Sequence, residues 1–348
     1  CDIAELKVRL KQQVETSADT PNELQSVSGI VGKSAAIELL RMQIKQLADS
    51  PYPVLIHGES GSGKELAAQN LHSCSQRKAH PFLTLNCAAF NDELLASQLF
   101  GHARGAFTGA TESKPGFFEE AGQGTLLLDE IADLPIDLQA KLLRVLENGE
   151  YYRVGETQPR MSKARVLAAS NKNLIEAIDK GLFREDLYHR LSVLSIRVPS
   201  VNEREQDKLV LLEFFQQKLD QQLKSFVLDD ESKKLWMLYD FPGNVRELRN
   251  IIIRLSAKYP GQTIKKSVLE QEMMQLTSRH GDLNEMDVFR KNLKAKGFQL
   301  NDELKRIEKE YINLALQESL NNMSKAASML GVNRSTLYGR MDRTEEMH

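Results

Sequence analysis

Short apolar runs alternate with longer amphipathic stretches in the first two thirds of the chain. Near-continuous apolar strands separated by helices are typical of a parallel sheet that is covered on both faces. The pattern therefore predicts an α/β domain over residues 25–199. The runs that predict its strands are residues 54–56, 82–85, 125–128 and 166–169.

The pattern changes along the rest of the chain. Residues 200–280 lack strand-like runs and predict a smaller helical domain, and residues 281–300 predict a linker. Residues 301–348 begin with an apolar face at helical spacing, followed by two shorter helices separated by Gly331. At the other end, residues 1–24 predict a charged helix with a thin apolar seam, which is either half of a short coiled coil or a linker.

Composition narrows the class of protein. A length of 348 residues predicts two or three domains, and a net charge of −2 means that any DNA-binding surface must be local. Three cysteines without zinc-ligand spacing argue against a disulfide framework and suit the cytoplasm. No apolar run approaches the ~18 residues that a membrane span needs. Because the chain does not begin with Met, we expect a regulatory domain, such as a phosphorylatable receiver, to precede it.

A glycine-rich loop follows the first predicted strand and precedes a helical stretch. In that context glycines let backbone N–H groups turn toward phosphates, and a lysine reaches the β- and γ-phosphates of a nucleotide. The alternative is a glycine-rich turn without a ligand. Position 65 lacks the usual hydroxyl, so Mg²⁺ must find its ligands elsewhere. The predicted nucleotide-binding residues of this P-loop are Gly58, Glu59, Ser60, Gly61, Ser62, Gly63, Lys64 and Glu65.

Two acids, Asp129 and Glu130, end the third apolar run. The carboxyl edge of a parallel sheet is where ligands collect in such folds. Asp129 would hold Mg²⁺, directly or through water, and Glu130 would polarise the water that attacks the γ-phosphate. The alternative is that the pair caps a helix. With a P-loop in the same domain, the pair favours ATP hydrolysis.

The P-loop and the strand that ends in Asp129 and Glu130 look like those of AAA+ ATPases. A hexapeptide preceded by Leu-Phe-Gly-His resembles the signature of bacterial enhancer-binding proteins, the activators of sigma-54 RNA polymerase; it consists of Gly105, Ala106, Phe107, Thr108, Gly109 and Ala110. The resemblance implies an AAA+ P-loop ATPase with a parallel sheet and helical lid, followed by an all-α helix-turn-helix domain. It also implies that dimers assemble into a hexameric ring that remodels the closed polymerase complex, and that Ile30 and Val31 line the nucleotide site.

The hexapeptide is mobile and has little core-forming value, because its residues are small and two are glycines. Phe107 would be either an exposed anchor for a partner or a side chain that packs back into the domain. The resemblance implies that all six residues contact sigma-54, mainly through Phe107 and Thr108. A second family insertion matches residues 147–160 and would support this loop. Gln98 stands where the family usually has an acid.

The resemblance also assigns residues that sense the nucleotide. Asn171 occupies the first sensor position, at the end of the fourth predicted strand. Asn86 matches a residue that holds the catalytic Glu130 away from water, although a polar strand end is equally often a turn cap. Arg246, in the segment Phe-Pro-Gly-Asn-Val-Arg-Glu-Leu, matches the second sensor in the lid.

Arg184 and Arg190 lie six residues apart on a predicted helix. Their ordinary explanation is surface ion pairing with Glu185 and Asp186, which contributes little to stability. The resemblance implies instead that they are arginine fingers that reach the ATP of the adjacent subunit. Guanidinium groups suit a γ-phosphate on which charge builds.

The chain ends in a segment that predicts a helix-turn-helix, with Gly331 at the turn and Asn333 or Ser335 as the cap of the second helix. Between residues 321 and 343 there are four basic residues and one acid. A structural three-helix bundle is the alternative, but the segment resembles a Fis-type domain, which implies dimerisation through the helix around residues 304–320. The residues predicted to face enhancer DNA in the major groove are Arg334, Ser335, Thr336, Tyr338 and Arg340.

Two other functions compete with an ATP-driven activator of sigma-54 polymerase. In the first, the ATPase fold is only a scaffold for a DNA-binding regulator, and the intact Lys64, Asp129 and Glu130 argue against this. In the second, the chain is a general AAA+ remodeller, and the hexapeptide and the helix-turn-helix argue against that.

Overall fold

The computed structural model describes residues 29–277, apart from residue 205 and residues 220–223. In the C-terminal part it describes residues 299–300, 304, 308, 311–312, 315–316, 319, 322–337 and 339. The chain forms two compact units, Cys1–Glu272 and Met273–His348. The predicted helix over residues 1–24 and almost all of the predicted linker over residues 281–300 lie outside the described residues.

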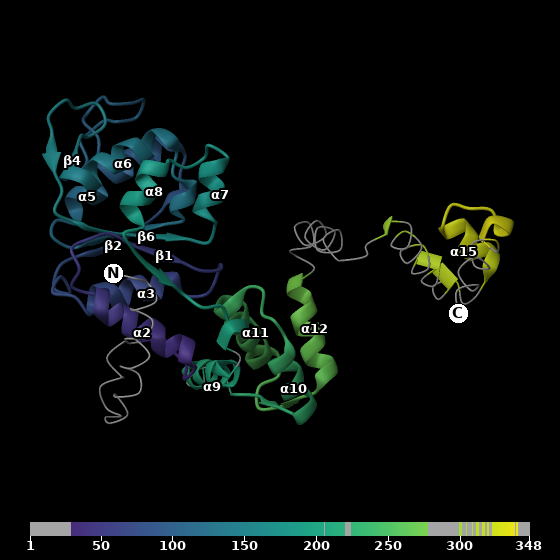
Figure 1. Ribbon diagram of the computed structural model, residues 1–348. Helices are drawn as coiled ribbons and strands as arrows, with labels where there is room; N and C mark the ends of the chain where they lie inside the picture. Colours follow the sequence, from purple (N-terminus) through teal and green to yellow (C-terminus); the bar gives the residue numbers. More distant parts are fainter. Residues whose placement is uncertain are drawn as a thin grey trace, which may run out of the picture. The chain divides into compact units, whose positions relative to one another are not determined.

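A five-stranded parallel sheet forms the centre of the first unit, with the strand order β2-β3-β6-β1-β7 (Figure 1). All four predicted strands are confirmed. The fifth, β7, was missed because its exposed Ser195 and Arg197 interrupt the apolar pattern. The strands are β1 (Val54–His57), β2 (Phe82–Asn86), β3 (Thr125–Asp129), β6 (Arg165–Ser170) and β7 (Leu194–Arg197).

Helices cover both faces of the sheet, as the near-continuous apolar strands predicted (Figure 1). Val54 and Ile56 of β1 pack with α2 (Ala35–Leu47) and α3 (Lys64–Ser73) on one face. Leu55, between them, points into the core on the other face. The helices that contribute to this second core are α4 (Asp92–Phe100), α5 (Phe117–Glu120), α6 (Ile136–Asn148), α7 (Leu174–Asp179) and α8 (Glu185–Leu191).

The helical lid follows the sheet and consists of α9 (Asp207–Leu219), α10 (Asp230–Leu238), α11 (Asn244–Lys258) and α12 (Lys266–Thr277). The expectation of an entirely helical segment was wrong in one detail. Two short strands, β8 (Val227–Leu228) and β9 (Thr263–Ile264), pair in parallel. Strands of two residues are defined by their pairing and leave no periodic pattern in the sequence.

The second unit contains α15 (Met323–Met329), which begins where the Asn322 side chain accepts a hydrogen bond from the backbone N–H of Lys325. Gly331 has φ +66°, a left-handed conformation that suits glycine, and it forms the predicted turn. The buried residues of this unit are Ile312, Ala315, Ala326, Ala327 and Leu337. In the parts of the chain that the structure describes, no helix is long and apolar enough to span a membrane.

Candidate nucleotide site and sigma-54 contact loop

The P-loop, residues 58–64, connects β1 to α3, as predicted. Gly63 has φ +108°, and a Cβ on Gly58 would lie 2.7 Å from the backbone oxygen of Val198, so neither position accommodates a side chain without strain. The buried Lys64 opens α3, and its Nζ donates to the backbone oxygens of Gly58 (3.0 Å) and Glu59 (3.3 Å). The ammonium group of Lys64 therefore lies within the P-loop, where a phosphate would also bind.

The acid pair at the end of β3 acts electrostatically on this lysine. Burial lowers the pKa of Lys64, whereas the negative charges of Glu130 and Asp129 act in the opposite direction. The same carboxylates act on the buried Cys87, whose pKa is raised to about 12 by its burial first and by Asp129, Asp133 and Glu130 in addition. A local negative potential therefore lies beside the lysine, as a site for a divalent cation requires.

Glu130 has a strained backbone. Its φ of +50° is unusual for a residue other than glycine and costs about 1–3 kcal/mol, and such residues cluster at functional sites. It precedes the short helix η3 (Ile131–Asp133) without capping it through its side chain. Instead its Oε2 accepts a hydrogen bond from the backbone N–H of Asn171 (3.4 Å). The structure thus brings together the predicted base and the predicted first sensor, and the helix-cap alternative does not describe Glu130.

Asn86 lies opposite Asp129 in the register of β2 and β3. Its Oδ1 accepts a hydrogen bond from the backbone N–H of Ala88 (2.8 Å) and caps the short helix η2 (Cys87–Ala89). Of the two roles expected for Asn86, the structure shows the turn cap. The predicted hold on Glu130 stays a prediction.

A cavity of about 560 Å³ adjoins the P-loop and is lined by Gly58, Glu59 and Asn171, together with residues of β7 and α7. Its lining does not include Lys64 or the acid pair. The phosphate site is therefore located by the P-loop geometry, and the cavity marks the space beside it.

The two predicted arginine fingers are engaged within their own subunit. Arg184 donates through Nε (3.0 Å) and Nη2 (2.6 Å) to Asp186, and this exposed pair raises the pKa of the guanidinium. Arg190 donates through Nε (3.0 Å) and Nη2 (2.8 Å) to the backbone oxygen of Leu146. For Arg184, the single chain thus shows the surface ion pair that was its ordinary explanation.

The hexapeptide loop, residues 105–110, is closed by its own backbone. Gly105 N–H donates to the oxygen of Ala110 (2.8 Å), and Ala110 N–H donates to that of Phe107 (3.0 Å). The half-buried ring of Phe107 packs edge-on against His102, with centroids 5.0 Å apart, while Thr108 is exposed. In this subunit Phe107 therefore packs back onto the domain, and Thr108 is presented to solvent.

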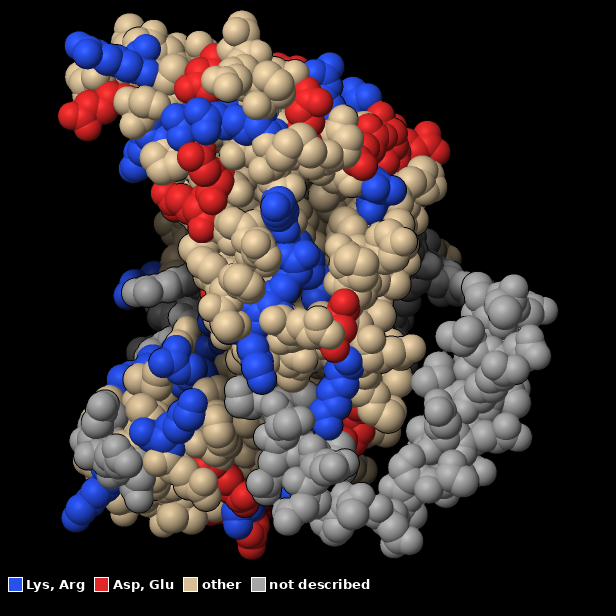
Figure 2. All heavy atoms as spheres, turned by 90° about the vertical axis from the view of Figure 1, so that its left-hand side faces the viewer, with Lys and Arg blue, Asp and Glu red and all other residues tan. Residues whose placement is uncertain are grey.

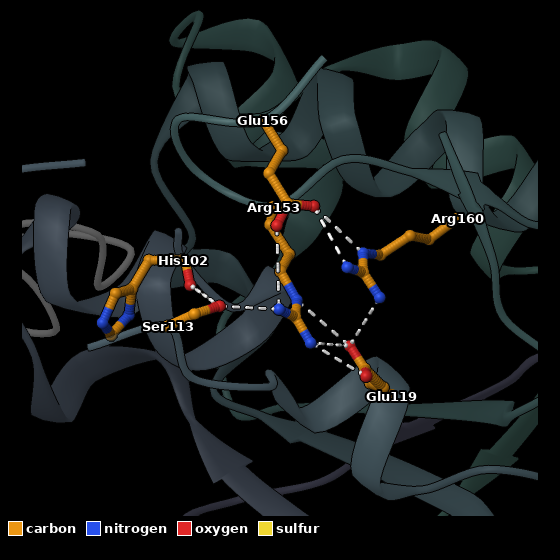
Figure 3. A network of polar contacts seen from close by, with 6 residues as sticks. All are labelled: His102, Ser113, Glu119, Arg153, Glu156 and Arg160. Carbon is orange, nitrogen blue, oxygen red and sulfur yellow. Dashed lines mark hydrogen bonds and ion pairs between the residues drawn. The ribbon is translucent and has the colours of Figure 1, made fainter. Parts of the chain in front are cut away.

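The second insertion contacts the base of this loop, as expected. Ala103 N–H donates to the oxygen of Val154 (2.9 Å), and a Cβ on Gly155 would lie 2.9 Å from the Cβ of Ala106. Behind these contacts lies a polar network that joins both segments to α5 (Figure 3). We call it the loop-base network; its members are His102, Ser113, Glu119, Arg153, Glu156 and Arg160.

Arg153 is the centre of the loop-base network. It donates through Nη2 to Oε2 of Glu119 (2.8 Å) and through Nη1 to Oγ of Ser113 (2.8 Å), and Ser113 in turn donates to the backbone oxygen of His102 (3.1 Å). Arg160 lies at the edge, 3.2 Å from Glu156 and 3.5 Å from Glu119 (Figure 3). The bonds from Arg153 and Arg160 to Glu119 were not predictable from the sequence, because these arginines and Glu119 are more than 30 positions apart.

Comparison with known families matches three successive segments. Residues 30–197 match the Sigma-54 interaction domain, residues 202–285 the AAA+ ATPase lid domain, and residues 303–343 the bacterial regulatory protein, Fis family. The DNA-binding transcriptional regulator NtrC of Rhizobium meliloti is 40% identical over 330 residues, which cover 88% of this chain and 68% of NtrC. The chain belongs to the family of sigma-54-dependent transcriptional activators.

Two further similarities support membership of the sigma-54-dependent activators. The nitric oxide reductase transcription regulator NorR2 of Cupriavidus necator is 41% identical over 322 residues, which cover 89% of this chain and 61% of NorR2, less than two thirds of its length. The crystal structure of NtrX from Brucella abortus in complex with ATP has 31% sequence identity and a TM-score of 0.67, covering 97% of this chain and 73% of that one.

The Fis-family segment of this activator presents polar side chains beyond its turn. Arg334, Ser335 and Thr336 are exposed, as predicted, whereas Tyr338 and Arg340 lie outside the described residues. On the face of the molecule shown in Figure 2, basic and acidic side chains are interspersed over the described surface, with a band of Lys and Arg at its centre.

Proposed function

We propose that this chain binds and hydrolyses ATP in a ring of subunits and uses the turnover to open promoters for sigma-54 RNA polymerase. One observation carries the proposal: Lys64 lies in the P-loop within the electrostatic influence of Asp129 and of a strained Glu130, which the Asn171 backbone contacts. Such an arrangement supplies the positioning and charge that phosphoryl transfer needs. Its presence favours a hydrolytic motor over a passive scaffold.

In the proposed reaction, N–H groups of the P-loop and Lys64 bind the β- and γ-phosphates, with the buried Ile30 and the half-buried Val31 beside the nucleotide. Glu130 accepts the proton of the attacking water, and Asn171 and Arg246 sense the γ-phosphate. Asp129 would hold Mg²⁺, which would supply positive charge to neutralise the transferred group. The donors fit Mg²⁺, which typically takes one or two carboxylates plus substrate phosphates.

The proposed ring of subunits rests on the roles inferred for Arg184 and Arg190. Arg184 and Arg190 contact Asp186 and the Leu146 backbone in their own subunit, and Arg184 is exposed enough to change partner. We infer that both reach the γ-phosphate bound to an adjacent subunit, so that an isolated subunit is inactive. Dimers formed through the Fis-family unit would assemble into this ring on enhancer DNA, and Arg334, Ser335, Thr336, Tyr338 and Arg340 would contact that DNA.

The experiment that tests the function measures ATP hydrolysis and open-complex formation by the 348-residue chain at a sigma-54 promoter. We expect hydrolysis to be required for opening, and both to be absent in Lys64→Ala. Lys78→Ala is the matched control because Lys78 is exposed and outside the site. Open complexes formed by Lys64→Ala at the rate of the unchanged chain would contradict the proposal.

A further inference from the structure

The first helix turn of α11, in the lid, lies directly against the P-loop. A Cβ on Gly61 would lie 2.3 Å from the backbone oxygen of Gly243, and Arg246 N–H points to the backbone oxygen of Gly61 (3.4 Å). Arg246 also donates through Nη1 to Oγ of Ser60 (3.2 Å). The two segments therefore meet backbone to backbone, and the position of the lid and the shape of the P-loop depend on each other.

Asn244, at the centre of this contact, joins three segments through one side-chain amide. Its Nδ2 donates to Oε2 of Glu59 (2.9 Å) and to the backbone oxygen of Ser60 (3.1 Å), both in the P-loop. Its Oδ1 accepts from the backbone N–H of Val201 (2.8 Å), where the chain enters the lid. Asn244 is 1% exposed, so its own amide would be left without a partner if these bonds were lost, although Glu59 and Ser60 are exposed. Donor and acceptor are both needed, and an amide supplies both.

The backbone conformation of Asn244 would suit glycine, so the need for asparagine at this position comes from its side-chain hydrogen bonds. Its φ is +53°, in the left-handed region that glycine adopts without strain and that asparagine tolerates better than most residues. Glycine would satisfy the backbone here but would make none of the three bonds. The preceding turn is fixed separately, because Glu247 accepts from Gly243 N–H (2.6 Å) and from the Tyr239 hydroxyl (2.8 Å).

We propose that Asn244 is a positioning residue that couples the closed lid to the phosphate-binding shape of the P-loop. The proposal rests on the proposed ATPase function and adds a residue to which no nucleotide role was assigned. The amide of Asn244 fixes Glu59 and the Ser60 carbonyl, and so orients the following N–H groups toward the phosphates. When the lid moves away from the P-loop, these bonds break and the P-loop binds the nucleotide more weakly.

The test is Asn244→Asp, which keeps the size, the tolerance for a left-handed backbone and the acceptor for Val201. It replaces the donor by a carboxylate oxygen that faces the Glu59 carboxylate and the Ser60 carbonyl. We expect ATP affinity, measured with a fluorescent ATP analogue, to fall about tenfold or more, since a buried polar contact is lost and like charges meet. The KM for ATP should rise by a larger factor than kcat falls.

A second substitution that restores ATP affinity distinguishes a positioning role of Asn244 from a role in folding. Glu59→Gln introduces an amide that donates to the new carboxylate at position 244, so the double variant should bind ATP more tightly than Asn244→Asp alone. The single variant Glu59→Gln completes the double-mutant cycle with the unchanged chain, Asn244→Asp and the double variant. Asn91→Asp is the matched control: Asn91 only caps α4, with its Oδ1 accepting from Leu94 N–H (3.0 Å), and an aspartate keeps that cap. Its ATP affinity should match that of the unchanged chain.

ATP affinity of Asn244→Asp equal to that of the unchanged chain would overturn the inference. Purely additive losses of ATP affinity in the variant that carries both Asn244→Asp and Glu59→Gln would also overturn it. Both results come from binding, so they are distinct from failure of the proposed function, in which the unchanged chain binds ATP but does not hydrolyse it. Thermal unfolding of each variant confirms that the affinities refer to folded protein.

Discussion

The phosphate site and the hexapeptide loop belong to the same unit but are held in opposite ways. Lys64 is buried, and the P-loop follows a strand whose Val54 and Ile56 are fully enclosed between layers of the fold. The hexapeptide loop instead rests on its own turns, on one ring contact between Phe107 and His102, and on a network whose charged members are partly exposed.

The difference separates the two tasks of a motor. A site that positions phosphates needs rigid surroundings, because misplacement of the reacting groups slows the reaction. A segment that delivers movement needs few buried contacts, because such segments open at low free-energy cost. In the proposed mechanism, the rigid end senses the γ-phosphate and the loosely held end transmits the change to sigma-54.

The largest effect is expected from Arg184→Ala, which removes the group that we propose acts across the subunit boundary. Turnover should fall on the order of 10³-fold, the range known for arginine fingers. Mixing these subunits with Lys64→Ala subunits should restore part of the ATPase activity, because each supplies what the other lacks. A mixture no more active than its parts would place Arg184 outside the shared site.

Glu130→Gln tests the rigid end within one subunit. Loss of the base should lower kcat by about 10²-fold or more, the usual contribution of a general base, while ATP affinity changes little. Asp133→Asn is the comparison, because Asp133 is a neighbouring acid that pairs with Lys172 instead of facing the P-loop lysine. Unchanged turnover in Glu130→Gln would remove Glu130 as the base.

Stability should show the same contrast between rigid and loosely held regions. Leu128→Ala, in the fully buried end of β3, should lower the free energy of unfolding by about 2–5 kcal/mol. Phe107→Ala, half-buried in the loop, should lower it by less than about 1 kcal/mol. Urea denaturation followed by circular dichroism measures both, and similar losses would contradict the comparison.

The smallest effects are expected in the loop-base network. Arg160→Ala removes only edge contacts and should change stability by at most about 0.5 kcal/mol, less still at high salt. Arg153→Ala should cost more, because its side chain is 12% exposed and bonds to both Glu119 and Ser113. Equal midpoints of thermal unfolding for the two variants would mean that Arg153 does not hold the loop base.

The sequence predicted what depends on local pattern. Strands buried on both faces leave continuous apolar runs, so β1, β3 and β6 were found. Of the two edge strands, β2 was found because three of its five residues are apolar, whereas β7 alternates apolar and polar residues and was missed. The P-loop and the acids after β3 were found because each site lies directly after a strand. Asn244 could not be assigned a role, because it contacts Glu59 across 185 positions through a left-handed backbone. The role proposed for Arg184 likewise concerns a neighbouring subunit, which one sequence does not place.

The measurement that tests the central claim most directly compares ATPase activity with open-complex formation in Thr108→Ala. Thr108 is exposed, at the end of the molecule that the account assigns to sigma-54. We expect ATP turnover within about twofold of that of the unchanged chain, since surface substitutions rarely disturb a fold, together with loss of promoter opening. Thr111→Ala, at an exposed threonine just beyond the loop, should retain both. Promoter opening by Thr108→Ala at the unchanged rate would contradict the claim that this loop couples hydrolysis to the polymerase.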